Sequence, residues 1–241
     1  MRQALVLAAG NGDRFVNGSS ESKLLQPLLG QPLILRTIHT AREAGISSFE
    51  IVLGYRAEAL RAVIEQHAPR ATSIQFTYNP DWRLENGVSV LAARDRFTRG
   101  HFALLMGDHV FEAGALSRLL QAPLEPGECV LGIDFRTTTP EIVEEATKVR
   151  LDGSRVVAIG KHLREFDALD TGMFVCSPSL FQALDRSRSL GDTTLSGGIR
   201  QLGVRRLVRG VDIGDADWYD IDTLADLEKA ETSLVALPER V

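Results

Sequence analysis

The sequence contains little cysteine and no excess of basic charge. Cysteine occurs only at Cys129 and Cys176, each inside an apolar run, which indicates core packing and argues against a disulfide framework or a cysteine-rich metal site. Basic residues number 27 against 32 acidic ones, and the formal net charge is -5. A broad basic surface for nucleic acid is therefore not expected, and basic residues near a site would act locally.

Long apolar runs are also missing. The N-terminus leads directly into an apolar strand without a cleavable hydrophobic region, and no run is long enough to cross a bilayer. We therefore expect a cytoplasmic protein without membrane insertion. The composition, 44% hydrophobic and 24% charged, is that of an ordinary globular protein, and neither a linker nor a repeat divides the chain. These features predict a single domain.

Apolar bursts alternate with segments of helical apolar spacing, which predicts an α/β protein with parallel strands joined by crossover helices. In the first half we expect strands at 4–7, 49–53, 74–78 and 102–106, and helices at 34–44 and 57–66. In the second half we expect strands at 130–135, 148–151, 156–159 and 172–176, and a closing helix at 222–233. The predicted organisation is a nucleotide-binding half over about 1–112 and an acceptor-binding half over about 113–241.

The most informative motif follows the first predicted strand. Residues 5–14 read LVLAAGNGDR, an apolar run that breaks into a glycine loop whose backbone amides can converge on phosphate oxygens. Arg14 and Lys23 supply the positive charge that those oxygens need. A dinucleotide fingerprint would need a third glycine where Phe15 stands, and the Gly-Lys-Ser/Thr of a Walker loop does not occur. We expect a nucleoside triphosphate site. The loop alone does not distinguish such a site from a simple glycine turn.

Carboxylates follow one other predicted strand and lie at the start of the last predicted helix. Asp108 comes directly after the apolar strand at 102–106 and a glycine, at the carboxyl edge where ligands bind in such sheets. Asp220 and Asp222 lie two residues apart on an extended segment and so face the same side. A hard cation such as Mg²⁺ suits these oxygens. Alternatively, Asp108 caps a helix starting near residue 112, and Asp222 or Thr223 caps the last helix.

Four other conspicuous residues are expected to be structural. His101 and His109 lie beside a strand, where a lone histidine is more often a hydrogen-bonded structural residue than a ligand or a base. Trp82 and Trp218 could stack on a base or a ring, but tryptophan more often packs in a core. We leave all four out of the predicted site.

These motifs together resemble the signature of the sugar-phosphate nucleotidyltransferases, the pyrophosphorylase superfamily. The signature is carried by residues 7–14, Lys23, Gly107-Asp108 and 220–223. Longer strings resemble the cytidylyltransferases that make CDP-inositol from L-myo-inositol 1-phosphate, and these lie at 86–89, 106–110, 145–149, 159–161, 163–167 and 170–172. The resemblance spans almost the whole chain. It implies a Rossmann-like nucleotidyltransferase fold in one domain, with a mixed, mostly parallel sheet flanked by helices.

The resemblance also implies roles for individual residues. Nucleotide binding is implied for Leu7, Ala8, Ala9, Gly10, Asn11, Gly12, Asn86 and Gly87, and catalytic roles for Arg14, Lys23 and Lys161. Acceptor binding is implied for Lys148, Asp170, Thr171 and Gly172, and Mg²⁺ binding for Asp108, Asp220 and Asp222. One departure concerns Lys23, which Ser22 and Leu24 flank where the family usually has proline, after a longer and more polar stretch at 16–21.

The implied reaction is attack by an acceptor phosphate oxygen on the α-phosphorus of CTP, with pyrophosphate as the leaving group. Related enzymes are often fused to a membrane-embedded synthase that consumes CDP-inositol; we expect that synthase to be a separate protein here. The alternatives are another acceptor, such as phosphocholine or a hexose 1-phosphate, and a non-catalytic nucleotide-binding regulator. Two separated metal carboxylates argue against the regulator. The sequence does not determine the oligomeric state, so a homodimer is one alternative.

Overall fold

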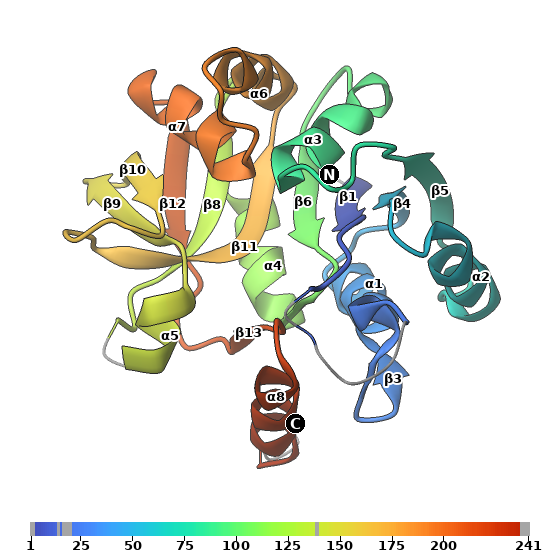
Figure 1. Ribbon diagram of the computed structural model, residues 1–241. Coiled ribbons are helices and arrows are strands. Elements are labelled where there is room, and N and C mark those ends of the chain that lie inside the picture. The colour runs from blue at the N-terminus through green and yellow to red at the C-terminus, as the bar shows by residue number, and fades with distance from the viewer. Residues whose placement is uncertain (1–2, 14, 16–20, 138–139, 237–241) are drawn as a thin grey trace.

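A nine-stranded sheet forms the centre of the protein (Figure 1). The computed structural model describes residues 3–13, 15, 21–137 and 140–236, with the backbone alone at 140–142 and 236. In spatial order the strands are β5 (Ser73–Tyr78), β4 (Ser48–Leu53), β1 (Gln3–Ala8), β6 (Phe102–Met106), β11 (Ala168–Cys176), β8 (Cys129–Asp134), β12 (Val208–Asp212), β10 (Arg155–Gly160) and β9 (Lys148–Asp152). Strands β5, β4, β1 and β6 are parallel, as is the β8–β12 pair, whereas β11 runs antiparallel to β6, β8 and β9.

Helices cover both faces of this sheet. They are α1 (Leu33–Glu43), α2 (Ala57–His67), α3 (Asn86–Ala92), α4 (Ala113–Gln121), α5 (Pro140–Glu145), α6 (Ser179–Ser189), α7 (Leu195–Val204) and α8 (Leu224–Ala236). Side chains alternate along each strand, so Leu5 packs in a core with α3, α6 and α7, while its neighbours Ala4 and Val6 pack in a second core with α1, α2 and α4. The predicted α/β fold with a mixed sheet is therefore confirmed.

Short elements complete the chain. These are the 3-10 helices η1 (Lys23–Leu25) and η2 (Arg94–Arg96) and the two-stranded pairs β2 (Pro27–Leu28) with β3 (Gln31–Pro32) and β7 (His109–Phe111) with β13 (Trp218–Asp220). Of the helices that the structure describes, none has both the length and the apolar character needed to span a bilayer. The two predicted halves share one sheet, because β6 of the first half pairs with β11 of the second.

The carboxyl edge of β1 and β6 positions the site. These strands pair in register up to Leu7 and Met106, and the amide of Gly107 then donates to the carbonyl of Leu7 at 2.9 Å. A Cβ atom on Gly107 would lie only 2.9 Å from that same carbonyl oxygen, so glycine permits the close approach. The chain then continues into β7, where His109 pairs with Asp220 of β13. Segments more than a hundred residues apart thus meet at this edge.

Two predicted start points lie two or more residues from the observed ones. Strand β11 begins at Ala168, before the predicted start at 172, because the strand continues through an irregularity between Asp170 and Phe174. Gly172 lies in this irregularity with a φ of +73°, a left-handed conformation that glycine adopts readily. Helix α8 begins at Leu224, after the predicted start at 222.

Candidate active site

A cavity of about 730 Å³ opens where the carboxyl edge of the sheet meets β7 and β13. Its wall includes residues from both halves of the chain. Asn86, Asp108 and His109 come from the first half, and Lys161, Asp170 and Asp220 from the second. Chemistry-bearing residues that the sequence separates widely therefore face one space.

Lys23 joins two of the predicted metal carboxylates. It begins η1, and its ammonium Nζ donates to Asp108 Oδ2 at 2.8 Å and to Asp222 Oδ1 at 3.0 Å. The lysine side chain is 8% exposed, against 28% for Asp108 and 14% for Asp222. Burial lowers the pKa of Lys23, but the two carboxylates outweigh that effect and raise it. The ammonium is therefore held charged between two acids.

The capping alternatives for Asp108 and Asp222 do not hold. Glu112 occupies the N-cap position of α4, and its side chain makes no capping hydrogen bond. At the start of α8 the cap is a reciprocal pair: Thr223 Oγ1 accepts from the amide of Asp226, and the Asp226 carboxylate accepts from the amide of Thr223. This arrangement is a capping box. It leaves the side chain of Asp222 to Lys23.

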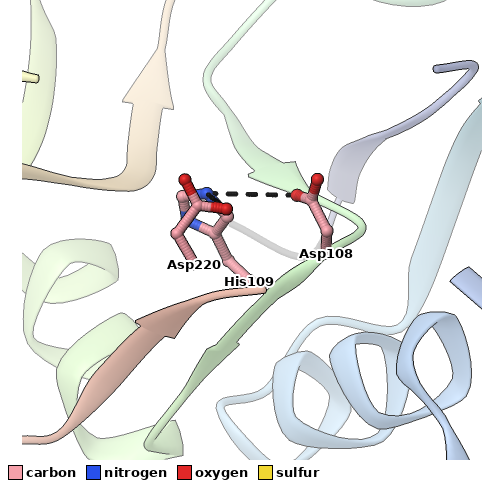
Figure 2. Close-up of side chains that lie close together, drawn as sticks. All are labelled: Asp108, His109 and Asp220. Atoms are coloured by element: carbon pink, nitrogen blue, oxygen red, sulfur yellow. Dashed lines mark ion pairs between the residues drawn. The ribbon is translucent and has the colours of Figure 1, made fainter. Parts of the chain in front are cut away.

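His109 lies at the centre of a second group (Figure 2). Its Nε2 is 3.4 Å from Asp220 Oδ1 and 3.9 Å from Asp108 Oδ1, and its Nδ1 is 3.1 Å from the carbonyl oxygen of Thr171. Burial lowers the pKa of His109, but Asp220 above all, then Asp108, raise it, to about 10. The sequence predicts a structural role for His109. The structure shows a hydrogen bond from its ring to a backbone carbonyl and also aims its other ring nitrogen at two carboxylates.

The donor set of this group fits a divalent cation. One oxygen from each of Asp108 and Asp220 and one nitrogen of His109 all lie within 4.8 Å of one another. Carboxylate oxygens are the ligands that Mg²⁺ prefers, usually together with water and substrate phosphates. The arrangement brings Asp108 and Asp220 together as candidate ligands, while Asp222 contacts Lys23. That magnesium binds here stays a prediction.

The glycine loop packs directly against Lys23. Gly12 has a φ of +66°, and a Cβ atom there would lie 2.9 Å from Lys23 Cβ. Ala9 is buried and its carbonyl accepts from the amide of Tyr55 at 2.9 Å, whereas Gly10 is exposed. The loop therefore presents open backbone next to the lysine. Arg14 lies outside the described residues, so its catalytic role stays a prediction.

Predicted acceptor residues divide into two groups. Asp170 and Gly172 lie on the cavity wall, as does the exposed Lys161. In contrast, Thr171 is fully buried and its Oγ1 donates to the carbonyl of Gly132 at 2.8 Å. Strand alternation explains the division, because Asp170 and Thr171 are neighbours on β11 and point to opposite faces.

Lys148 is not on the cavity wall but contacts the backbone of the segment that carries Lys161. Its side chain is buried, and Nζ donates to the carbonyl of Lys161 at 3.0 Å and to that of Ala146 at 3.4 Å. The ammonium therefore holds the backbone of the segment that carries Lys161. Asp170 accepts a hydrogen bond from the amide of Gly172 at 2.8 Å, and burial raises the pKa of Asp170 to about 6.

The start of α7 contributes wall residues that the sequence did not indicate. Thr194, Leu195 and Ser196 line the cavity, as does Arg200, which donates to the carbonyl of Ile159 at 2.8 Å. Helix α7 is linked to the predicted nucleotide-binding segment, because Asn86 Oδ1 accepts from the amide of Leu195 at 2.8 Å. The sequence predicts neither α6 nor α7. The cavity-wall residues at the start of α7 therefore become apparent only in the structure, where Asn86 contacts this helix.

Comparison with known proteins identifies the fold and the family. A family profile described as MobA-like NTP transferase domain matches residues 4–200. Two curated relatives are "Bifunctional IPC transferase and DIPP synthase" of Rubrobacter xylanophilus, 35% identical over 231 residues, and of Aquifex aeolicus, 31% identical over 237 residues. The matches cover 95% and 96% of this chain and 51% of each relative, so the chain spans about half their length.

Among solved structures, the inositol-1-phosphate CTP transferase from T. maritima superposes with a TM-score of 0.84 and 26% identity. The superposition covers 100% of this chain and 98% of that one. The predicted Rossmann-like nucleotidyltransferase fold is thereby confirmed.

Proposed function

The chain belongs to the family of MobA-like NTP transferase domains and is an enzyme of the nucleotidyltransferase class, and we propose that it transfers a cytidylyl group from CTP to inositol 1-phosphate. The products are CDP-inositol and pyrophosphate, and the reaction depends on Mg²⁺. The observation that carries the proposal is that one cavity is lined both by Asp108 and Asp220 and by Lys161 and Asp170. The similarity to an inositol-1-phosphate CTP transferase supports the choice of substrates.

The chemistry needs alignment and charge neutralisation. An oxygen of the acceptor phosphate forms a new bond to the α-phosphorus of CTP while the bond to the bridging oxygen of pyrophosphate breaks. Mg²⁺, when bound by Asp108 and Asp220, would neutralise charge on the phosphates. The protein need supply no covalent nucleophile, because the acceptor phosphate is itself the nucleophile.

Lys23 has a donor to spare for the triphosphate. An ammonium carries three N–H donors, and the two carboxylates occupy two of them. The third can reach a phosphate oxygen beside the glycine loop, against which the lysine packs. Asp108 and Asp222 therefore orient Lys23 before substrate arrives, and this preorganisation favours the transition state.

The acceptor wall suits a phosphorylated polyol. Lys161 provides a point charge for a phosphate, and the carboxylate of Asp170 can accept hydrogen bonds from ring hydroxyls. A substrate without those hydroxyls leaves buried polar groups unpaired and is disfavoured. Phosphocholine is such a substrate, so the wall favours inositol 1-phosphate over it.

Pyrophosphate release tests the proposal. The purified protein is given each of the four NTPs with inositol 1-phosphate, phosphocholine or glucose 1-phosphate, and we expect CTP with inositol 1-phosphate to be turned over far faster than the other pairs. Equal or faster turnover of phosphocholine would overturn the acceptor assignment and leave the enzyme class standing.

Asp170→Ala tests the acceptor wall with a matched control. Asp170→Ala should slow the inositol reaction more than the phosphocholine reaction and so narrow the preference. Asp212→Ala is the control, because Asp212 makes the same turn contact, accepting from the amide of Gly214 at 2.8 Å, in an exposed turn. If both variants change the ratio of inositol 1-phosphate turnover to phosphocholine turnover equally, Asp170 only stabilises a turn.

A further inference from the structure

We propose that His109 is a third protein ligand of the divalent cation, beside Asp108 and Asp220. The inference rests on the proposed metal-dependent transfer and adds an imidazole to a site for which the sequence indicated only carboxylates. It changes the chemistry of the site, because an imidazole nitrogen favours different metal ions from those that a purely carboxylate site favours.

The carbonyl of Thr171 determines which nitrogen of His109 faces the carboxylates. A carbonyl oxygen only accepts hydrogen bonds, so Nδ1, at 3.1 Å from it, must carry the proton of that contact. The nitrogen that remains for a metal is Nε2. Histidines that bind metals typically donate their other ring N–H to a backbone carbonyl or a carboxylate, which fixes the orientation of the ring. His109 has this arrangement.

Nε2 points at the two candidate metal carboxylates. It lies 3.4 Å from Asp220 Oδ1 and 3.9 Å from Asp108 Oδ1, and Figure 2 shows the three side chains grouped together. In the neutral ring, the Nε2 lone pair and the carboxylate oxygens all present negative charge to the same small space. A cation bound by the three atoms removes that repulsion. An imidazolium that pairs with Asp220 alone is the competing role.

Gly172 keeps the ring in this position. A Cβ atom on Gly172 would lie 2.1 Å from His109 Nδ1 and 2.2 Å from Cε1, so only glycine leaves room for the imidazole. The ring is thus confined between β7 and the irregularity of β11, and its side chain is 12% exposed. A ligand held this firmly is preorganised. The same glycine lies on the acceptor wall, so the wall and the metal group are in direct contact.

The test uses Mn²⁺ as the probe, bound to the full-length protein in the presence of CTP. Pulsed electron paramagnetic resonance detects nitrogen bonded to Mn²⁺. We expect a nitrogen coupling in the wild-type protein that changes from the ¹⁴N to the ¹⁵N pattern when the protein carries ¹⁵N-histidine. Because the nucleotide keeps its ¹⁴N, this change assigns the coupling to histidine.

Two variants identify which histidine is responsible. His109→Asn keeps an N–H near the carbonyl of Thr171 but removes Nε2, so it should abolish the coupling and weaken Mn²⁺ binding on the order of ten-fold. Mg²⁺ affinity, measured by competition, should fall less. His162→Asn is the matched control, because His162 lines the same cavity outside the group and should keep the coupling.

Each remaining outcome is informative. Mn²⁺ bound to the wild-type protein without a histidine coupling would overturn the role of His109 and leave the proposed function standing. Absence of Mn²⁺ binding, with pyrophosphate release still requiring a divalent cation, would overturn the ligand group as a whole. If His109→Asn fails to fold, a histidine coupling that persists in His162→Asn assigns the coupling to His109, the other histidine on the cavity wall.

Discussion

Two charge clusters in this protein, each centred on a buried side chain, have opposite composition. In the first, Lys23 lies between the carboxylates of Asp108 and Asp222. In the second, the carboxylate of Glu128 contacts the guanidinium groups of Arg155 and Arg209, the latter at 3.4 Å. One cluster therefore carries a surplus of negative charge and the other a surplus of positive charge.

Their surroundings differ as well. Asp108 is 28% exposed and opens on the cavity, whereas Glu128 is 3% exposed and immediately precedes β8. The surplus charge beside Glu128 is shared with the protein, because Arg209 also donates to the carbonyl of Pro123. A buried ion pair is by itself weak evidence of stability or of function. Access to a cavity and unbalanced negative charge distinguish the cluster that can bind a cation.

The largest expected effect is the loss of turnover in Asp108→Asn. The change removes a metal carboxylate and one partner of Lys23, and loss of such transition-state stabilisation costs roughly a hundred- to a thousand-fold in rate. Pyrophosphate release at saturating Mg²⁺ and CTP measures it. Asp185→Asn, at a half-exposed ion pair with Arg94, is the control and should keep normal turnover. Near-normal turnover in Asp108→Asn would show that the two clusters do not differ in function.

Glu128→Gln should have the converse effect. Two guanidinium groups lose their carboxylate, and because both are partly exposed we expect the free energy of unfolding to fall by about 2–3 kcal/mol. Turnover per folded molecule should stay close to that of the wild type. Urea denaturation and pyrophosphate release measure the two quantities. A larger fall in turnover than the unfolded fraction explains would place the second cluster in the catalytic machinery.

Lys23→Met should change the response of stability to magnesium. Without the ammonium, Asp108 and Asp222 repel each other, and we expect a loss of about 1–2 kcal/mol in unfolding free energy. Mg²⁺ should restore part of it, because ligands that bind only the folded state stabilise it. The increase in Tm on adding Mg²⁺ should therefore exceed that of the wild type. Equal increases in Tm in the two proteins would mean that Lys23 and Mg²⁺ do not interact with the same carboxylates.

A smaller effect concerns the acid limb of stability. Burial raises the pKa of Glu128, but hydrogen bonds from Arg155 and from the amide of Glu125, together with both arginine charges, outweigh it and lower the pKa below its usual value. The unfolded chain then binds more protons, so the contribution of Glu128 is present above pH 4.5 and is lost as pH falls through the folded pKa. The stability difference between the wild type and Glu128→Gln should shrink from pH 6 to pH 3. A constant difference would contradict this.

Much of the fold was predictable because its elements are local. The strands near Leu5 and Leu104 are short apolar runs of the kind that buried strands have, and the structure confirms them. Helices α6 and α7 were not predicted. In α7 the reason is that glycines such as Gly197 and Gly198 have low helical propensity. The close packing of α7 against α6 explains the glycines, because a Cβ atom on Gly198 would lie 2.6 Å from the side chain of Leu184 in α6.

The site was predictable in its residue types and not in its pairings. Lys23 and Asp108 were predicted as site residues, but nothing local indicates that the lysine contacts Asp222 and that Asp220 contacts His109. The pairing of β7 with β13 decides this, because it sets residues 109 and 220 opposite each other.

By itself, the sequence determined the α/β order, the glycine loop and the carboxylates that follow it, because periodicity, glycine and charge act over a few residues. Only the tertiary structure decided that Asp170 faces the cavity while Thr171 turns to Gly132, and that Lys148 holds the backbone of Lys161. The physical reason is that long-range strand pairing sets the register, and the register determines which face each side chain occupies.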